Sequence, residues 1–477
     1  MSIGEQVASS VHWMAGMRVV SQALSWVGTL IVIRILVPED YALMALASVV
    51  IGLLDILDDM GLADAIVKQK DPSKEYIKQI FGLLLVFNAV FYSILFFTSP
   101  YVAEFFDDER LILIINVLGL QIIIRTFFYI PDAFMRRKMQ FKKISIINLT
   151  SMVGLSVTTL VCAFSGLGVW SLVFGTLMAT VIQTIGAITF SRYFCFPNFS
   201  YKGVEDSLSF GVYVVIQRLL FYFYNVADVV IIGKILGPKL LGNYTVAIQI
   251  ASLPLDKFMR ILNDVGFSAF ASIQDDQEKM NRLLCKAVRV LSVVVFPVFI
   301  GISAIAPELV NVLLGEKWQA AITPLQIISA VMALKMMNIT EPLLFAMGRP
   351  DVNVRAILVG CFIMPLAFYL GSFWGLLGVS LSWLIAYPVY FLIAMKISLA
   401  TIGMKISTYV KQFMLPAIFC LIMYISVFLA REFLCPLIDN EILELVTLIL
   451  VGAVTYTALV MSFHREAINQ LYSMVRG

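Results

Sequence analysis

The sequence predicts an all-α integral membrane protein, a bundle of about fourteen membrane-spanning helices with little mass outside the lipid. Composition is the first reason, because 60% of the residues are hydrophobic and only 14% are charged, whereas soluble domains average about 45–50% apolar and about 25% charged residues. The second reason is that the apolar residues gather into long runs. The third is that the short connectors between these runs alternate in charge.

Most of the apolar runs are close to the roughly 17–25 residues that a spanning helix requires. They lack the alternation of a strand, and in lipid a single segment can satisfy its own backbone groups only as a helix. The first run is followed by many others, so it is expected to be a membrane helix and not a cleaved signal peptide. The predicted helices are residues 13–36, 41–58, 80–99, 111–130, 144–164, 168–190, 210–236, 241–268, 286–306, 321–345, 354–373, 376–397, 408–430 and 442–463.

The connectors divide into a basic set and a cation-poor set, and the two sets alternate along the chain. Segment 136–143 contains five lysines and arginines, whereas segment 104–109 (EFFDDE) is acidic. Because basic loops stay on the cytoplasmic side of a membrane, the basic connectors are predicted to be cytoplasmic. An even number of helices then places both termini on that side.

Several classes of site are not expected. The net charge of +3 gives no argument for nucleic acid as a partner. The six cysteines are scattered without a CxxC pair, and the two histidines lie near opposite ends of the chain, so neither a zinc site nor a histidine-based catalytic centre is expected. The phosphate-binding loop of nucleotide hydrolases is also missing from the sequence. We therefore expect no metal, no cofactor and no enzymatic activity.

An internal repeat relates the two halves of the chain. Segment 34–38 (RILVP) matches segment 234–238 (KILGP), and at the same offset Arg18 matches Arg218. The first six helices and the next six therefore look like two copies. Since six is an even number, both copies have the same orientation, and an axis along the membrane normal should relate them, with substrate bound between them.

The repeat predicts four parts of the chain. Residues 1–190 are expected to form an N-terminal six-helix lobe, and residues 191–209 a linker along the cytoplasmic surface. Residues 210–400 are expected to form the second six-helix lobe, and residues 401–477 an extra helix pair with a cytoplasmic tail.

Three segments resemble motifs of a known family. These are segment 33–41 (IRILVPEDY), segment 59–67 (DMGLADAIV), and Pro131 followed by segment 135–141 (MRRKMQF). They resemble the Wzx-type O-antigen and exopolysaccharide flippases of the multidrug/oligosaccharidyl-lipid/polysaccharide exporter superfamily. Ala42 replaces a glycine that is usual in the first motif. The extra C-terminal helix pair exceeds the twelve-helix core, as in the related lipid II flippases, which leaves open a lipid-binding groove or a packing role.

The resemblance implies a V-shaped transporter of two lobes that works by alternating access without hydrolysing a nucleotide itself. The implied cargo is an undecaprenyl-diphosphate-linked oligosaccharide, moved from the cytoplasmic to the periplasmic leaflet of the bacterial inner membrane. It would serve the synthesis of lipopolysaccharide O-antigen, capsule or exopolysaccharide. Besides this cargo and membrane lipid, the implied partners are a polysaccharide polymerase and its chain-length machinery.

Ionisable residues inside the predicted helices mark the candidate site, because each costs at least about 2.5–3.5 kcal/mol at the centre of a bilayer. Arginine suits a diphosphate through its planar fork of donors, and amide or hydroxyl side chains suit sugars. Arg18 and Arg218 are the predicted symmetric phosphate clamp. The full set of candidate substrate-binding residues comprises the cations Arg18, Arg218, Arg260, Arg125 and Lys335 and the polar residues Gln22, Ser25, Tyr222, Asn225 and Gln249.

The carboxylates within the same helices suggest a coupling ion, H⁺ or Na⁺, at Asp55, Asp59, Asp228 or Asp256. Structural alternatives remain open at these positions. Arg260 lies one helical turn from Asp256, and Arg18 could pair with Asp55, so either pair could be an internal salt bridge. Solvation near the cytoplasmic surface is a further alternative for Asp55 and Asp59.

The sequence leaves two rival functions to compare with a flippase. A drug or metabolite antiporter of the same superfamily would share the fold, but exporters of cationic drugs need acidic cavities, and five candidate cations favour an anionic cargo. A membrane-embedded polysaccharide polymerase or ligase would need a catalytic loop, whereas every predicted periplasmic loop is short and contains no cluster of acid, base and nucleophile.

Overall fold

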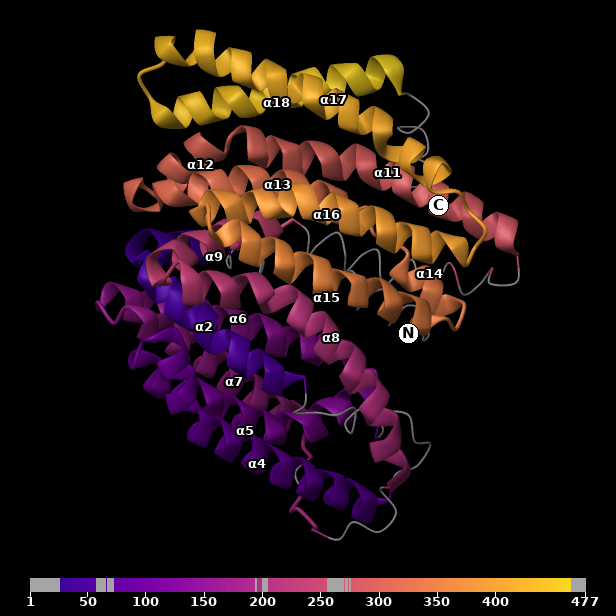
Figure 1. Ribbon diagram of the computed structural model, residues 1–477. Helices are drawn as coiled ribbons and strands as arrows, with labels where there is room; N and C mark the ends of the chain where they lie inside the picture. Colours follow the sequence, from indigo (N-terminus) through magenta and orange to yellow (C-terminus); the bar gives the residue numbers. More distant parts are fainter. Residues whose placement is uncertain are drawn as a thin grey trace. The chain divides into compact units, whose positions relative to one another are not determined.

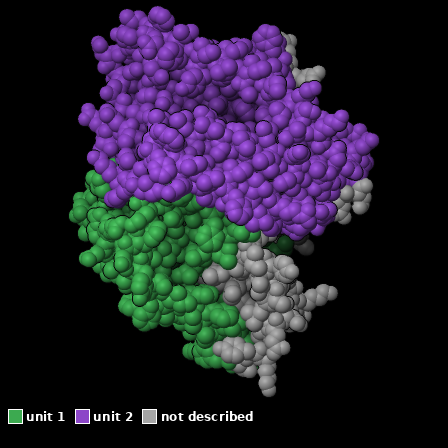
Figure 2. Space-filling model, viewed as in Figure 1, with its two compact units in different colours: residues 1–234 green, residues 235–477 purple. Residues whose placement is uncertain are grey.

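A computed structural model of the chain describes residues 26–56, 66, 73–193, 195–199, 205–254, 270, 273 and 276–464, and only the backbone of residues 205–217. The chain divides into two compact units, residues 1–234 and residues 235–477 (Figure 2). This division groups most of the predicted seventh helix with the first unit. The lobe boundaries derived from the repeat stay a prediction.

The first unit is built around one central helix, α5 (Arg110–Arg137), which packs against α2, α4 and α7 (Figure 1). Helix α6 packs along α7. Buried aliphatic residues on α4 and α5, among them Ile80, Leu84 and Ile130, form the core between these two helices. The other described helices of this unit are Trp26–Ile35, α2 (Pro38–Asp55), α4 (Lys74–Phe106), α6 (Phe141–Phe164), α7 (Val169–Ser191) and α8 (Glu205–Ile235).

In the second unit, α13 (Ile322–Lys335) packs against α9, α11 and α16. Helices α15 and α16 form one antiparallel pair, and α17 packs against both α11 and α18. The remaining elements of this unit are α9 (Pro238–Ser252), α11 (Gln277–Ala304), α12 (Ala306–Leu313), the short 3₁₀ helix η1 (Glu316–Ala321), α14 (Glu341–Ala346), α15 (Pro350–Ser372), α16 (Gly375–Ala400), α17 (Ile406–Phe433), the 3₁₀ turn η2 (Cys435–Leu437) and α18 (Glu441–Phe463).

The all-α prediction is confirmed. Each predicted run overlaps a helix in the described residues, and nine of the described helices are long and apolar enough to cross a membrane. Local signals set where several helices begin. Ser73 accepts a hydrogen bond from the Tyr76 amide at the start of α4, and Asn440 accepts bonds from two amides at the start of α18, as expected of N-cap residues.

The prediction of one continuous helix over residues 321–345 is wrong, because the structure has two helices there. Helix α13 ends at Lys335, residues 336–340 are not helical, and α14 starts again at Glu341. Pro342 has no N–H to continue the helical ladder and its ring opposes a continuous helix at this point. The Tyr409 hydroxyl on α17 donates to the carbonyl of Met337, which gives the interrupted backbone a partner inside the protein.

The linker between the sixth and seventh helices packs against the start of α4. The backbone N–H of Asn198 donates to the Lys78 carbonyl over 2.9 Å, and the Tyr193 ring stacks on Phe134 at 4.0 Å between centroids. A Cβ atom at Gly82 would collide with the Asn198 carbonyl. The glycine in α4 therefore makes room for this part of the linker.

Gly378 lets α16 approach α15 closely, and its replacement tests the packing. A Cβ atom at Gly378 would collide with the backbone carbonyl of Gly371. Because backbone cannot move aside as a side chain can, we expect Gly378→Ala to destabilise the protein by about 1–3 kcal/mol. Thermal unfolding of the purified protein in detergent measures this. The control is Gly301→Ala in α11, where a Cβ meets no atom within 4 Å; equal unfolding midpoints for the two variants would contradict the packing.

Candidate functional site

An ion pair in the first unit joins two of the residues that the sequence singled out. Arg125, in the middle of α5, donates to the carboxylate of Asp55 at the end of α2 over 2.9 Å. The packing of α2 against α5 brings the two side chains together. About a third of each remains exposed, 35% of Arg125 and 34% of Asp55, so the pair is accessible at a surface of its unit.

Helix α8 reaches the same place through Tyr222. The Tyr222 hydroxyl donates to the carbonyls of Val49 and Ser48, at 2.5 and 3.2 Å. This approach depends on Gly52, because a Cβ atom there would lie 2.6 Å from the hydroxyl oxygen. Gly52 is one turn before Asp55 on α2, so α8 contacts α2 close to the ion pair between α2 and α5.

Among the residues that the structure describes, Arg218 and Asn225 on α8 form no hydrogen bond or ion pair with Asp55 or Arg125. Arg218 is exposed, and within the described part of the chain it makes no ion pair. Asn225 donates to the Phe221 carbonyl of its own helix over 2.7 Å. Asp228 is only 3% exposed and accepts a hydrogen bond from the amide of the next residue, Val229.

The remaining candidates of the first unit and of the eighth predicted helix lie outside the described residues. They are Arg18, Gln22, Ser25, Asp59, Asp256 and Arg260. Two of the proposed salt bridges, Arg18 with Asp55 and Arg260 with Asp256, therefore stay predictions. The partner that the structure gives Asp55 is Arg125, from a helix that is distant in sequence.

One candidate cation of the second unit, Lys335, lies against an aromatic ring. Lys335 is the last residue of α13, and its Nζ lies 5.4 Å from the centroid of the Trp383 ring on α16. The Trp383 indole N–H donates to the Tyr244 hydroxyl on α9 over 2.7 Å. Gln249 is half-buried on the same helix as Tyr244. A cation over an indole face is stabilised by about 0.5–2 kcal/mol, so Trp383 positions this lysine.

Sequence reasoning missed Trp383 and Tyr244. Both have an apolar body and one polar atom, and both are almost fully buried. A buried tryptophan or tyrosine usually needs a hydrogen-bond partner, which was the available signal. The partners themselves could not be found, because Tyr244 and Trp383 come from helices that are far apart in the sequence.

A surface ion pair holds the far end of α8. Lys234 Nζ lies 2.6 Å from the Asp107 carboxylate and 5.5 Å from the centroid of the Phe105 ring. In the same loop, hydrogen bonds from Arg110 hold the pKa of Asp108 below its usual range. The contacts of Lys234 hold this helix end at the surface, where an exposed ion pair contributes only about 0–1 kcal/mol.

A second ion pair connects the C-terminal helix pair to the rest of its unit. Arg431 on α17 donates through two nitrogens to the two carboxylate oxygens of Glu308 on α12, at 2.5 and 2.8 Å. It also donates to the carbonyl of Ala304, at the end of α11. The carboxylate is largely buried, with 9% exposed, and the arginine side chain is 23% exposed. Helices α17 and α18 are therefore fixed by a buried pair as well as by apolar packing.

These features offer binding groups for an anion. In the described residues, no group of three or more histidines, cysteines and carboxylates is placed to hold a metal ion. What the geometry provides is one arginine held by a carboxylate in the first unit and one lysine held by an indole in the second. Both arrangements fix a cation in position, as the binding of phosphate requires.

Comparison with known proteins identifies relatives of this chain. A family model described as polysaccharide biosynthesis protein matches residues 31–323. The chain is 25% identical over 421 residues to the lipopolysaccharide biosynthesis protein WzxC of Escherichia coli K12, and the match covers 87% of this chain and 86% of WzxC.

Two solved structures share the fold. The lipid II flippase MurJ in an inward closed conformation superposes with a TM-score of 0.74 at 13% identity, covering 95% of this chain and 99% of MurJ. An inward-facing MATE-family multidrug resistance transporter superposes with a TM-score of 0.63 at 17% identity, covering 79% of this chain and 95% of the transporter. The MurJ match extends over more of this chain than the MATE match does.

Proposed function

Because the chain belongs to the polysaccharide biosynthesis protein family, we propose that it is a flippase, a transporter that moves lipid-linked oligosaccharides across a membrane. The observation that carries the proposal is the match of the family model over residues 31–323, a region that contains the Asp55–Arg125 pair. The chain is a multi-pass membrane protein, and its fold matches nearly all of a lipid II flippase. It is a transporter and not an enzyme.

We propose more specifically that the cargo is an oligosaccharide on undecaprenyl diphosphate, moved from the cytoplasmic to the periplasmic leaflet of a bacterial inner membrane. The product would serve lipopolysaccharide, capsule or exopolysaccharide synthesis, in which a polymerase and its chain-length machinery follow. Both termini are proposed to be cytoplasmic. Alternating access of the two lobes, coupled to H⁺ or Na⁺ at Asp55, Asp59, Asp228 or Asp256, is the proposed mechanism.

The proposed role of Arg125 is to bind the cargo's phosphate. Asp55 fixes the orientation of the guanidinium from one side, and about a third of the arginine side chain is exposed. An arginine fork donates two parallel hydrogen bonds to phosphate oxygens. Lys335 is proposed to act in the same way from the second unit, where Trp383 orients it.

The arrangement of Asp55 argues against the rival drug antiporter. A site for a cationic drug needs carboxylates that face the cargo, but Asp55 is already hydrogen-bonded to Arg125. The likeness to a MATE transporter concerns the fold alone, and one fold serves many functions.

Reconstitution tests the proposed function. The purified protein would be placed in liposomes that carry a fluorescent polyprenyl-diphosphate oligosaccharide, and the fraction of this lipid exposed on the outer leaflet would be followed with a membrane-impermeant quencher. Exchange between leaflets that depends on the protein, with a H⁺ or Na⁺ gradient where one is needed, supports the flippase. Transport of a cationic dye with no exchange of the oligosaccharide under either gradient would support the antiporter instead.

The symmetric clamp predicted from the repeat has its own test. We expect the double variant Arg18→Ala and Arg218→Ala to abolish glycan export, because each arginine contributes charge-assisted bonds of about 1.5–3 kcal/mol to a phosphate. Surface polysaccharide is measured by gel and immunoblot in a strain whose own copy has been deleted. Membrane levels of the variant, measured in parallel, exclude loss of insertion. Full export by the double variant would contradict the clamp.

A further inference from the structure

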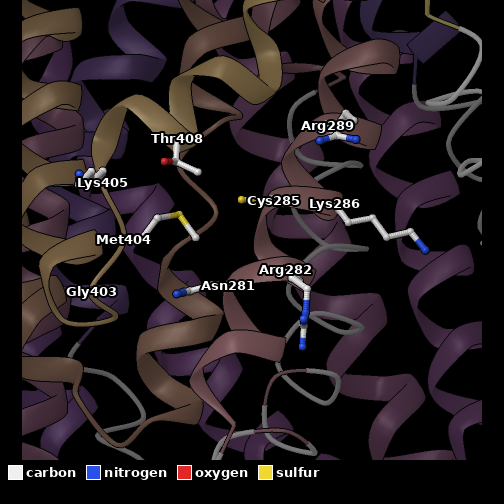
Figure 3. A pocket seen from close by; sticks show the side chains of 9 residues that line it. All are labelled: Asn281, Arg282, Cys285, Lys286, Arg289, Gly403, Met404, Lys405 and Thr408. Carbon is white, nitrogen blue, oxygen red and sulfur yellow. The ribbon is translucent and has the colours of Figure 1, made fainter.

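A basic cavity in the second unit lies apart from Lys335 and Trp383. Its volume is about 560 Å³, and it lies between the N-terminal half of α11 and the turn that leads into α17. Figure 3 shows Arg282, Lys286 and Arg289 on the α11 side and Lys405 and Thr408 on the facing segment.

One wall of the cavity is the turn before α17, which includes Gly403 and Met404. The Asn281 side chain donates to the Ile402 carbonyl over 3.3 Å and connects the turn to α11. Gly403 has a φ of +63°, a conformation that residues with a side chain rarely adopt. Within the described residues, α11 and α17 pack against each other along their length. The cavity is therefore part of the packed unit.

Positive charge is concentrated around this cavity. Arg282, Lys286 and Arg289 follow each other at spacings of four and three residues and so share one face of α11. Lys405 is on the opposite wall. Arg289 donates two hydrogen bonds to the side-chain oxygen of Gln412, at 3.1 and 2.7 Å, and this partner is neutral.

Carboxylates compensate little of this charge. Arg282 has a long contact of 3.8 Å to Glu278, and both side chains are largely exposed. Among the residues that the structure describes, Lys286, Arg289 and Lys405 form no ion pair. A cavity with four cations and one weak acidic contact would attract an anion.

The N-terminus of α17 provides a second feature that favours an anion. The helix is 28 residues long, and its N-cap residue Lys405 makes no side-chain hydrogen bond to the first turn. Backbone N–H groups at such an end, together with the helix dipole, bind phosphate or carboxylate groups. The Thr408 side chain, also in the first turn, lines the cavity.

The position of the cavity identifies the kind of anion. Helices α11 and α17 are both long and apolar enough to span a membrane, and both begin at this cavity. It thus lies where a spanning helix leaves the lipid, on the side that its basic residues assign to the cytoplasm. At this depth the abundant anions are lipid phosphates, which basic pockets between helices bind.

We propose that this cavity is a binding site for the phosphate headgroup of an anionic lipid in the cytoplasmic leaflet. The positive charges of Arg282, Lys286, Arg289 and Lys405 attract the phosphate, and the Thr408 hydroxyl in the first turn of α17 donates a hydrogen bond to it. The bound lipid connects the C-terminal helix pair to α11 at the membrane surface.

Native mass spectrometry of the full chain tests the site, with phosphatidylglycerol as the probe. The first variant is Arg282→Gln with Lys286→Gln and Lys405→Gln, which leaves the Arg289–Gln412 contact in place. Each cation removed is expected to weaken lipid binding about fivefold, so that the triple variant binds about 100-fold more weakly. The matched control removes three exposed lysines of the same predicted face, Lys74→Gln, Lys138→Gln and Lys396→Gln, and should retain the lipid.

A second variant distinguishes a loss of lipid binding from a loss of folding. Thr408→Glu places a carboxylate in the first turn of α17, where it stabilises a helix, but it also occupies and repels an anion site. We expect normal thermal stability together with at least about fivefold weaker binding of phosphatidylglycerol.

Competition identifies the source of the phosphate. Displacement of phosphatidylglycerol by undecaprenyl diphosphate, but not by inorganic phosphate at equal concentration, supports a lipid headgroup site and shows that the cargo's carrier can enter it. Displacement by inorganic phosphate at equal concentration would overturn the requirement for a lipid. Equal lipid retention by the wild type, the triple variant and Thr408→Glu would overturn the site itself. Glycan export is not measured, so the outcome does not depend on the proposed flippase function.

Discussion

Arg125→Gln is expected to reduce export of the glycan by about 10- to 100-fold, because it removes charge-assisted hydrogen bonds worth about 1.5–3 kcal/mol to the cargo's phosphate. The same change also leaves Asp55 without the partner that lies 2.9 Å away in the structure. Export is measured as surface polysaccharide in a deletion strain that expresses each variant at matched membrane levels. Arg125→Lys keeps the charge but loses the planar fork, so we expect it to restore export only in part.

Exchanging the charges of Asp55 and Arg125 distinguishes a role in phosphate binding from a role in folding. In the variant Asp55→Arg with Arg125→Asp, the ion pair can re-form between α2 and α5, so the protein should be as stable as the wild type. We nevertheless expect export to remain low, because the cation has moved to the other helix. Export by the exchanged variant at the wild-type level would show that the pair serves the fold alone. Wild-type export by Arg125→Gln would contradict the binding role directly.

The second large effect concerns the attachment of the C-terminal helices. Arg431→Leu should lower stability by about 3–5 kcal/mol, because it leaves the largely buried Glu308 carboxylate without its partner. The change also removes the hydrogen bond to the Ala304 carbonyl. We expect a clear drop in the thermal unfolding midpoint in detergent, and faster proteolysis between α16 and α17.

A compensating change is the control for this prediction. When a buried ion pair is replaced by apolar residues, the stability of a protein often changes little. Glu308→Leu combined with Arg431→Leu should therefore recover most of the stability that Arg431→Leu loses. If Arg431→Leu unfolds at the wild-type temperature, the pair does not hold α17 and α18 in place. If the double variant is no better than the single one, the geometry of the pair matters beyond its charge.

The helices could be predicted from the sequence because lipid leaves the backbone few choices. Runs such as 376–397 and 442–463 agree with α16 and α18 to within a few residues. The sequence does not predict the break between α13 and α14 at residues 336–340. Pro342 indicates either a kink or a break, and the hydroxyl that supports a break comes from Tyr409, more than sixty positions further along the chain.

The sequence indicates candidate residues for the site, but it does not indicate which side chains pair with them. Arg125, Asp55 and Lys335 were selected because charges inside membrane helices need a reason. Their partners depend on which helices pack together, and this information is not local in the sequence. The basic cavity shows the same limit, since only the packing of α11 and α17 places Lys286 and Lys405 around one cavity.

The sidedness of the accumulated cargo tests the central claim most directly. The gene would be deleted in its host, and the accumulated lipid-linked oligosaccharide would be probed in spheroplasts and in inverted membrane vesicles with a membrane-impermeant glycan label. A flippase predicts that the units build up on the cytoplasmic face, are labelled only in inverted vesicles, and disappear when the intact gene is returned. Units that are already accessible from outside in spheroplasts would contradict the account and indicate a later step, polymerisation or ligation.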